Sequence, residues 1–178
     1  VVWMSHLVQR YRDNVQNDMD IPQAVISSEG NTTDGVSLSF SSSESVGTWL
    51  MTVTMDNKNP YTAFSMNINL PEGVTAGDAA LGERMPFHNI ISSKDGIKIL
   101  AYSPNNAYIA GNSGSVFSIQ LTADSDISKG NYPISITDIR VVTGNAKEEE
   151  LASAEAVLYV SDTAIRDIVS DSFQIAYY

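Results

Sequence analysis

The sequence predicts an all-β fold, a nine-stranded sandwich of two packed sheets. This prediction depends on short runs of alternating apolar and polar residues, on the Gly, Pro, Asn, Asp and Ser that bound them, and on the lack of a convincing helical pattern over residues 36–160. The clearest run extends from Tyr61 to Gly73, where the two kinds of side chain alternate strictly until a turn. With 178 residues, 43% of them hydrophobic, the chain can build one real core.

The first element that the pattern predicts is a short amphipathic helix from Val1 to Asp13. Its apolar residues recur at helical spacing near one stripe, which consists of Val1, Met4, Leu7, Val8 and Tyr11. The following stretch to Gly35 is polar and contains proline, which is typical of a linker. We therefore expect residues 1–35 to form an N-terminal helix and linker, residues 36–160 the sandwich, and residues 161–178 a C-terminal tail.

Nine strands follow in the sandwich, each ended by turn residues. They are predicted near Val36–Phe40, Gly47–Met55, Tyr61–Leu70, Val74–Ala76, Phe87–Ser92, Gly96–Ser103, Ser115–Ala123, Tyr132–Val141 and Ala154–Val160. Because successive side chains of a strand point to opposite faces, the apolar parity indicates which residues enter the core. The predicted inward residues are Trp49, Met51, Val53 and Met55; Thr62, Phe64, Met66, Ile68 and Leu70; Ile97, Ile99 and Ala101; and Phe117, Ile119, Leu121 and Ala123.

The eighth predicted strand changes parity along its length. Ile134 and Ile136 share one face, whereas Ile139 and Val141 share the other. A strand that keeps all four side chains in the core needs one extra residue, so we expect a β-bulge near Asp138.

Composition excludes several classes of function. The chain carries 10 basic and 21 acidic residues, a formal net charge of -11 at pH 7, which repels nucleic acid and anionic lipid head groups. It has no cysteine, so disulfides, thiol catalysis and thiolate metal sites are excluded. No apolar run approaches the roughly 18 residues that a membrane-spanning helix needs. We expect a protein that does not bind nucleic acid and does not span the membrane.

No group of residues has the spacing of a catalytic or zinc site. His6 and His88, the only histidines, are about eighty residues apart and lack the partners that bind zinc. The acidic residues lie mostly in or beside turns, and GNSGS around Ser113 lacks the strand-to-helix context of a nucleophile elbow. We therefore expect no enzyme, no catalytic residue and no metal site. Calcium is the one cofactor left open, with the oxygen-rich stretches Asp56–Asn59 and Asp124–Gly130 as candidate loops and plain turns as the alternative.

The order and spacing of five segments carry a resemblance to a known family. The segments are VGTWLMTVTMDN, YTAFSMNINLPEGV, GIKILAYSPNN, GNSGSVFSIQLTAD and YPISITDIRV. Over Val36 to Val160 they are similar to the cohesin-like domains of secreted and cell-surface proteins of Bacteroidetes. The resemblance implies a flattened, nine-stranded sandwich of jelly-roll topology, non-catalytic and used for recognition outside the cytoplasm. In cohesins the partner is a dockerin, which docks on the sheet formed by the eighth, third, sixth and fifth strands.

Both ends of the chain carry further resemblances. VVWMSHLVQRY at the start looks like the second helix of a dockerin-type repeat without its calcium loop, and an ordinary helix packed on the sandwich is the alternative. TAIRDIVSDSFQIAYY at the end resembles the opening of the C-terminal sorting tails of Bacteroidetes secreted proteins. We expect residues 161–178 to be the start of a truncated sorting segment.

Parity also predicts a binding surface on the outward face of the third and sixth strands. On the sixth strand Lys98, Leu100 and Tyr102 point outward, and the last two are apolar where water would be expected. On the third strand the outward positions include Asn67 and Asn69. An exposed apolar patch rimmed by Ser and Asn is typical of a recognition surface. We predict that these five residues bind the partner; the alternative is that the N-terminal helix covers them.

The sequence therefore predicts a non-catalytic recognition or adhesion module, secreted or on the outer cell surface, that binds a protein partner. The alternative is a carbohydrate-binding module, in which exposed aromatic side chains stack on a surface glycan. Tyr61, Tyr102 and Tyr108 are the candidates for that role, but aromatic residues make up only 8% of the chain. No signal peptide is visible, and since the chain opens mid-pattern at Val1, an export signal can lie upstream.

Overall fold

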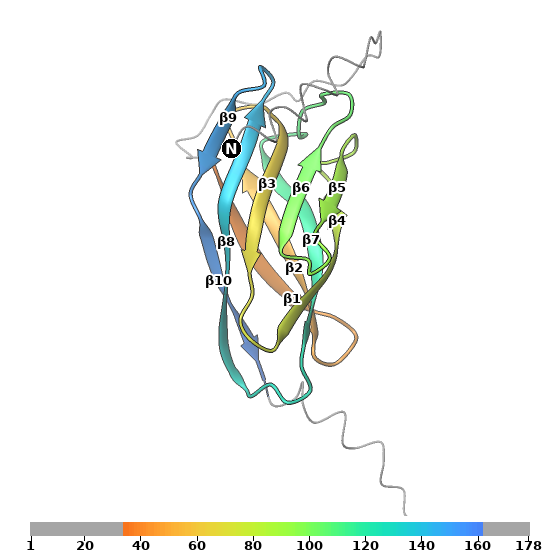
Figure 1. Cartoon of the computed structure of the whole chain (residues 1–178), viewed down its shortest axis with the longest axis vertical. Helices are drawn as coiled ribbons and strands as arrows, with labels where there is room; N and C mark the ends of the chain where they lie inside the picture. The colour runs from red at the N-terminus through yellow and green to blue at the C-terminus, as the bar shows by residue number, and fades with distance from the viewer. Residues whose placement is uncertain (1–33, 162–178) are drawn as a thin grey trace, which may run out of the picture.

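The structure, a computed structural model, describes residues 34–161, which form ten strands in two antiparallel sheets (Figure 1). The strands are β1 (Gly35–Ser42), β2 (Thr48–Asp56), β3 (Tyr61–Asn69), β4 (Val74–Leu81), β5 (Asn89–Ser92), β6 (Lys98–Tyr102), β7 (Ser113–Ala123), β8 (Gly130–Thr143), β9 (Glu148–Leu151) and β10 (Ala154–Val160). The predicted N-terminal helix, nearly all of the linker and the sorting tail lie outside the described residues and stay predictions. Within residues 34–161 there is no helix of the length and hydropathy needed to cross a membrane.

The smaller sheet has four strands in the order β1-β2-β7-β4. The larger has six, with the order β10-β8-β3-β6-β5 and with β9 paired to β8. β1 lies near β10 and β4 near β5, so strands from opposite sheets meet at both edges of the sandwich. The predicted all-β sandwich is confirmed. The larger sheet also contains the strand order β8-β3-β6-β5 that the resemblance implies.

Two pieces of strand were not predicted from the sequence. Glu148–Leu151 is acidic, and charged residues have low β propensity, so the pattern does not reveal β9. This strand pairs with β8 near the sheet edge, where charged side chains discourage pairing with other chains. β4 runs on to Leu81, past its predicted end at Ala76, because pairing with β7 resumes after an irregularity at Gly77 and Asp78. Ten strands therefore replace the predicted nine.

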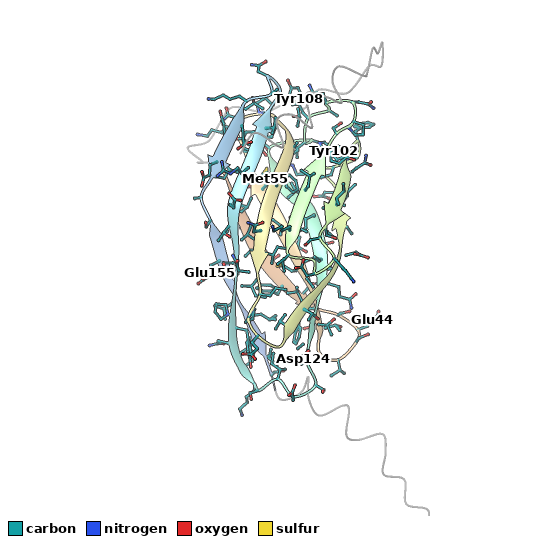
Figure 2. All side chains as sticks on the ribbon, viewed as in Figure 1. Glu44, Met55, Tyr102, Tyr108, Asp124 and Glu155 are labelled. Atoms are coloured by element: carbon teal, nitrogen blue, oxygen red, sulfur yellow. The ribbon has the colours of Figure 1, made fainter. Side chains whose placement is uncertain are left out.

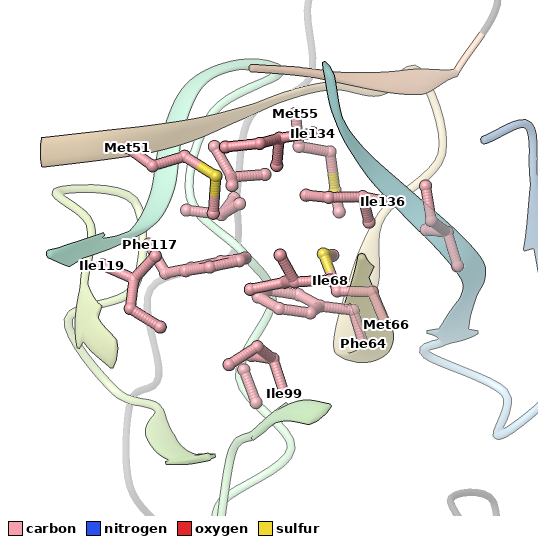
Figure 3. Packing of buried hydrophobic residues seen from close by; sticks show 14 of the residues in the cluster. Met51, Met55, Phe64, Met66, Ile68, Ile99, Phe117, Ile119, Ile134 and Ile136 are labelled. Carbon is pink, nitrogen blue, oxygen red and sulfur yellow. The ribbon is translucent and has the colours of Figure 1, made fainter. Parts of the chain in front are cut away.

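The core lies between the sheets, where the inward faces of β2, β3, β7 and β8 meet (Figure 3). Phe64 on β3 and Phe117 on β7 stack with their ring centroids 6.0 Å apart and their planes inclined by 27°. The flexible side chains that fill the space around the rings are Met51, Met55 and Met66. Trp49, predicted to pack inward, belongs to the same buried cluster.

The inward faces predicted for β2, β3 and β7 are confirmed except at Tyr61, and Ile97 before β6 also differs from its prediction. Tyr61, predicted to point outward, is 1% exposed and belongs to the core. The cause is a register shift of β3 against β8 between Tyr61 and Ala63. Thr62 is buried as predicted, and its hydroxyl donates a hydrogen bond to the carbonyl of Val142. Ile97, predicted to lie in the core, precedes β6 and is only half-buried.

The bulge predicted near Asp138 is confirmed. In the register of β8 against β3, Arg140 faces Ser65 and Thr137 faces Asn67, which leaves one extra residue on β8. Asp138 has a φ of 50°, a left-handed conformation that Asp tolerates better than most residues. The four apolar side chains on both sides of the bulge therefore enter the core: Ile134, Ile136, Ile139 and Val141.

A buried arginine joins three segments at the end of the sandwich that carries the β2–β3 and β6–β7 connections. Arg84, between β4 and β5, is 4% exposed. The acceptors of its guanidinium hydrogen bonds are the carbonyls of Met55, Ala110 and Gly111 and the side-chain oxygen of Asn57. Burial lowers the pKa of Arg84, while the charges of Asp56 and Glu83 act in the opposite direction. An arginine nevertheless stays charged at neutral pH.

His88, just before β5, is a second buried titratable group and is 5% exposed. Within the described residues no hydrogen bond of good geometry reaches either ring nitrogen, although backbone groups of Thr62 and Ala107 lie close to the ring. Burial lowers the pKa of His88 to about 4, although the backbone groups of Thr62 and Ala107 act to raise it. The imidazole is therefore neutral in the folded protein at pH 7.

We expect the protein to lose stability as the pH falls from 7 to 5. The unfolded chain binds a proton at His88 with the ordinary pKa of 6.5, whereas the folded chain does so only with a pKa of about 4. Between these values the unfolded state binds more protons, so the free energy of unfolding decreases by about 1 to 2 kcal/mol from pH 7 to pH 5. Urea unfolding of the wild type and of His88→Leu at both pH values measures this loss. The variant should lack it, and a loss of equal size in the variant would contradict the assignment to His88.

Candidate binding face

The candidate site is the outward face of the larger sheet, on the side of β8, β3, β6 and β5 that points away from the core. Asn67 on β3 pairs with Lys98 on β6. Leu100 and Tyr102 occupy the next outward positions of β6. Since neighbouring residues of antiparallel strands present their side chains on the same face, these four predicted binding residues share one surface.

This face is hollowed beside β6. The depression has a volume of about 450 Å³ and is bounded by four adjacent strands. The side chains that line it from the outward face are Ser65 and Asn67 on β3, Lys98 and Leu100 on β6, Ile91 on β5 and Asp138 on β8. The structure thus brings three of the five predicted residues, Asn67, Lys98 and Leu100, to one hollow.

Two residues of the hollow were missed in the sequence analysis. Ile91 is 52% exposed and pairs directly with Leu100, so it extends the apolar wall onto β5. The sequence pattern that could have revealed Ile91 is the parity of β5: Ile90 packs against the core, so Ile91 must point to the opposite face. Asp138 reaches the hollow because the bulge adds a residue to β8 and turns its side chain outward. The bulge was predicted from the sequence, but this consequence was not drawn.

A charged network on β8 and β9 lies next to the hollow. Nε of Arg140 is 2.9 Å from Oδ1 of Asp138, and another of its nitrogens is 3.1 Å from Oε1 of Glu148. A third nitrogen lies 3.6 Å from Oε2 of Glu150. The hydrogen bonds to Asp138 and Glu148 raise the pKa of Arg140. Asp138 and Glu150 are exposed while Arg140 and Glu148 are partly buried, so the network adds little stability at its outer pairs but gives this surface a charge pattern that a partner can recognise. Lys98 supplies a positive charge two strands away, on β6.

Asn69 lies on the same face but does not line the hollow. Its Nδ2 donates hydrogen bonds to the hydroxyl oxygens of Ser135, at 3.2 Å, and Thr137, at 3.0 Å. The side chain is exposed and connects β3 to β8. Asn69 therefore lies at the edge of the candidate site, and its contact with a partner stays a prediction.

Leu100 and Tyr102 are more buried than the sequence analysis expects. They are 7% and 9% exposed and form a second cluster with Ala63 and Val142, which are both 0% exposed. We call these four residues the outer apolar cluster. Leu100 and Tyr102 point away from the core, because Ile99 and Ala101, which alternate with them on β6, belong to the core cluster. Figure 2 places Tyr102 toward the end of the sheet that also carries Tyr108. The expectation of an open apolar patch is corrected: the open part of the face is the hollow.

Comparison with known proteins identifies the fold but finds no close relative. No family model and no curated protein matches the sequence. Among solved structures, a non-cellulosomal cohesin from the archaeon Archaeoglobus fulgidus is similar with a TM-score of 0.60 at 10% identity, covering 74% of this chain and 94% of that chain. A cohesin module from a family 33 glycoside hydrolase of Clostridium perfringens has a TM-score of 0.59 at 13% identity, covering 72% and 97%.

A further similar chain comes from a type I cohesin–dockerin complex of Clostridium thermocellum. Its TM-score is 0.56 at 8% identity, and the match covers 81% of this chain and 99% of that chain. The chain has a cohesin-like fold. This fold agrees with the resemblance drawn from the sequence segments.

Within this cohesin-like fold, the tyrosines considered for sugar stacking offer little free ring surface. Tyr61 is 1% and Tyr102 is 9% exposed. Tyr108 is half-buried, and its hydroxyl packs so closely against Gly144 that a Cβ at that position would collide with it. A sugar ring needs an exposed aromatic face to stack on. The described geometry therefore does not favour the carbohydrate-binding alternative.

The two candidate calcium loops are turns held by protein contacts in the cohesin-like fold. In Asp56–Asn59, Nδ2 of Asn57 donates a 2.7 Å hydrogen bond to the carbonyl of Asn59, and Oδ1 of Asn57 accepts one from Arg84. In Asp124–Gly130, the amide of Ile127 donates to the carbonyl of Asp124 at 3.1 Å. Among residues 34–161 there is no group of three or more His, Asp or Glu side chains that could hold a metal ion.

Proposed function

We propose that the protein is a non-catalytic recognition module, secreted or on the outer cell surface, that binds a protein partner on the outward face of β8, β3, β6 and β5. The observation that supports this most is the hollow on that face, bounded by the four strands in the order implied by the cohesin resemblance. Solved structures with a similar fold include cohesins in complex with dockerins. A dockerin-type module is therefore the first partner class to test.

The chemistry of the hollow suits a protein ligand. Ile91 and Leu100 supply apolar wall on β5 and β6, and Ser65 and Asn67 supply hydrogen-bonding groups beside them. An apolar centre with a polar rim is the usual composition of a protein interface, in which a few buried anchors carry most of the binding energy. The exposed side chain of Ile91 is the natural contact for an anchor of the partner.

Charges around the hollow favour a defined orientation of the partner. Lys98 on β6 and the Arg140 network on β8 and β9, in which three carboxylates surround one guanidinium, present opposite net charges on the two sides of β3. Such an arrangement steers encounter and disfavours the reversed pose more than it raises affinity. The resemblance to Bacteroidetes surface proteins supports a role in scaffolding or adhesion at the cell surface.

We expect Ile91→Asp to weaken binding of a dockerin-type module by at least about tenfold, because it places an unpaired charge against an apolar anchor. The measurement is isothermal titration of the purified chain with a panel of dockerin modules. Leu50→Asp is the matched control, since Leu50 on β2 is 41% exposed on the outward face of the other sheet. Both variants should keep the urea midpoint of the wild type. Equal affinities for the two variants, or loss of binding only with Leu50→Asp, would contradict the proposed face.

A further inference from the structure

The outer apolar cluster is buried although it lies on the outward face of a sheet. Figure 1 looks onto this face, and no described strand crosses in front of β3 and β6. Ala63 is flanked by Tyr102 and Val142 on its two neighbouring strands, which contributes to its burial, but a ring as large as that of Tyr102 stays exposed on a sheet surface unless something packs over it, and Tyr102 is only 9% exposed. The cluster therefore has the character of a covered surface rather than of an open one.

The chain enters the described fold at the end of the sandwich where β3 begins, and Ala63 of the cluster lies near the start of that strand. Asp34, which precedes β1, accepts a 2.6 Å hydrogen bond from the hydroxyl of Tyr61, two residues before Ala63 on β3. It also accepts hydrogen bonds from the backbone amides of Lys58, at 2.7 Å, and Asn59, at 3.3 Å. Partial burial acts to raise the pKa of Asp34, but these hydrogen bonds outweigh it and lower the pKa. The carboxylate is thus ionised at neutral pH, and it fixes Asp34 beside the β2–β3 turn, at the end of the sandwich where β3 begins.

The sequence before Asp34 contains a predicted apolar stripe, of the chemistry that packs on such a cluster. Its members are those of the predicted amphipathic stripe: Val1, Met4, Leu7, Val8 and Tyr11. Residue numbers 11 and 34 differ by 23, and a connection of that length can extend over roughly 70 Å. A nine-residue strand such as β3 spans only about 30 Å, so the stripe can reach any part of the sheet.

Charge also matches. Arg10 and Arg12 are among only 10 basic residues in a chain of net charge -11, and they lie on the same stretch as the stripe. Glu148 on β9 pairs in register with Val142 of the cluster, and Glu150 follows on the same outward face. Both carboxylates already contact Arg140, but with Asp138 they outnumber that one guanidinium, so a basic segment placed on the cluster would lie beside a net negative charge.

We propose that the stretch from Val1 to Tyr11 packs its apolar stripe on the outer apolar cluster and covers the part of the binding face next to the hollow. The contact is intramolecular, and its existence does not depend on the proposed function. Its regulatory consequence does: a partner that needs Leu100 and Tyr102 must first displace the segment. A dockerin-type partner would then bind more tightly to a chain in which this contact is broken.

The test uses the full chain with a spin label on an introduced cysteine, because the protein has no cysteine of its own. Gln9→Cys places the label on the side of the predicted helix away from the stripe. The paramagnetic label should broaden the amide NMR signals of Ala63, Leu100 and Tyr102. Adding Leu7→Asp to the labelled chain should abolish the broadening. As a positional control, a label at Asp124→Cys lies at the opposite end of the sandwich (Figure 2) and should leave these signals sharp.

A second measurement separates the contact from general effects of charge. Leu7→Asp should expose the cluster and raise the fluorescence of an apolar-surface dye several-fold, whereas Gln9→Asp, which adds the same charge off the stripe, should not. Sharp cluster signals in the Gln9→Cys chain would overturn the proposal and assign the cover to another part of the chain, such as the β6–β7 connection. That result would leave the dockerin titrations with Ile91→Asp and Leu50→Asp unaffected, so the two proposals fail separately.

Discussion

Phe64→Ala is expected to lower the free energy of unfolding by about 3 to 5 kcal/mol. The phenyl ring is 0% exposed and stacks on Phe117, so it joins the larger sheet to the smaller one. Its removal lowers the free energy of unfolding in two ways. The burial of the ring is lost, and a cavity remains between two sheets that cannot close fully around it. A typical domain has a total stability of about 5 to 15 kcal/mol, so the variant should be largely unfolded in moderate urea. Equilibrium urea unfolding followed by tryptophan fluorescence measures the change.

Tyr159→Ala is the matched control for Phe64→Ala. Tyr159 lies on β10 of the same sheet but is 63% exposed, so its truncation should change stability by no more than about 0.5 kcal/mol. If Phe64→Ala were soluble with an unchanged urea midpoint, the inward and outward faces of β3 would have to be exchanged. The binding face would then lose its basis as well.

Arg84→Met is expected to cost about 3 kcal/mol or more, even though methionine fills much of the same volume. The substitution leaves buried acceptors without donors, among them Oδ1 of Asn57 and the carbonyl of Gly111, which lie 2.7 Å and 2.8 Å from the guanidinium. Loss of a buried donor costs the desolvation of every acceptor that it served. Relief from burying the guanidinium charge offsets part of this cost. Thermal and urea unfolding both report the loss.

The control for Arg84→Met removes a positive charge at an exposed site. Lys94→Met, in the turn between β5 and β6, should leave the urea midpoint nearly unchanged. A mild effect of Arg84→Met, equal to that of Lys94→Met, would show that the joint between β2, the β4–β5 connection and the β6–β7 connection does not depend on the guanidinium. Hydrogen exchange at the end of β2 would decide between local and global loss, because only a joint should loosen Met55 and Asn57 first.

The sequence predicted the strands and their faces well because side-chain alternation is a local property. Phe64, Trp49 and Ile119 could be placed in the core from parity alone. The bulge at Asp138 could be predicted too, since the apolar parity reverses within one strand and only an extra residue reconciles the two halves. β9 was missed because its acidic residues carry no apolar alternation.

The candidate site was only partly predictable. Asn67, Lys98 and Leu100 were placed on the outward face by parity, and the structure brings them to one hollow. Ile91 joins them because β5 is the neighbour of β6. The apolar–polar alternation within each strand does not indicate which strands are neighbours. The carbohydrate hypothesis weakened for a similar reason: whether Tyr61 is exposed depends on a register shift against β8, a strand about eighty residues away.

By itself, then, the sequence determined the all-β class, the inward faces and the outward direction of Leu100 and Tyr102. Only the tertiary structure decided that these two side chains are nearly buried, that Arg84 is a buried joint and that His88 is neutral. The physical reason is one of range. The face of the sheet to which a side chain points follows from the two-residue repeat of the strand backbone. Its burial, its hydrogen-bond partners and its pKa are set instead by groups that folding brings together from distant parts of the chain.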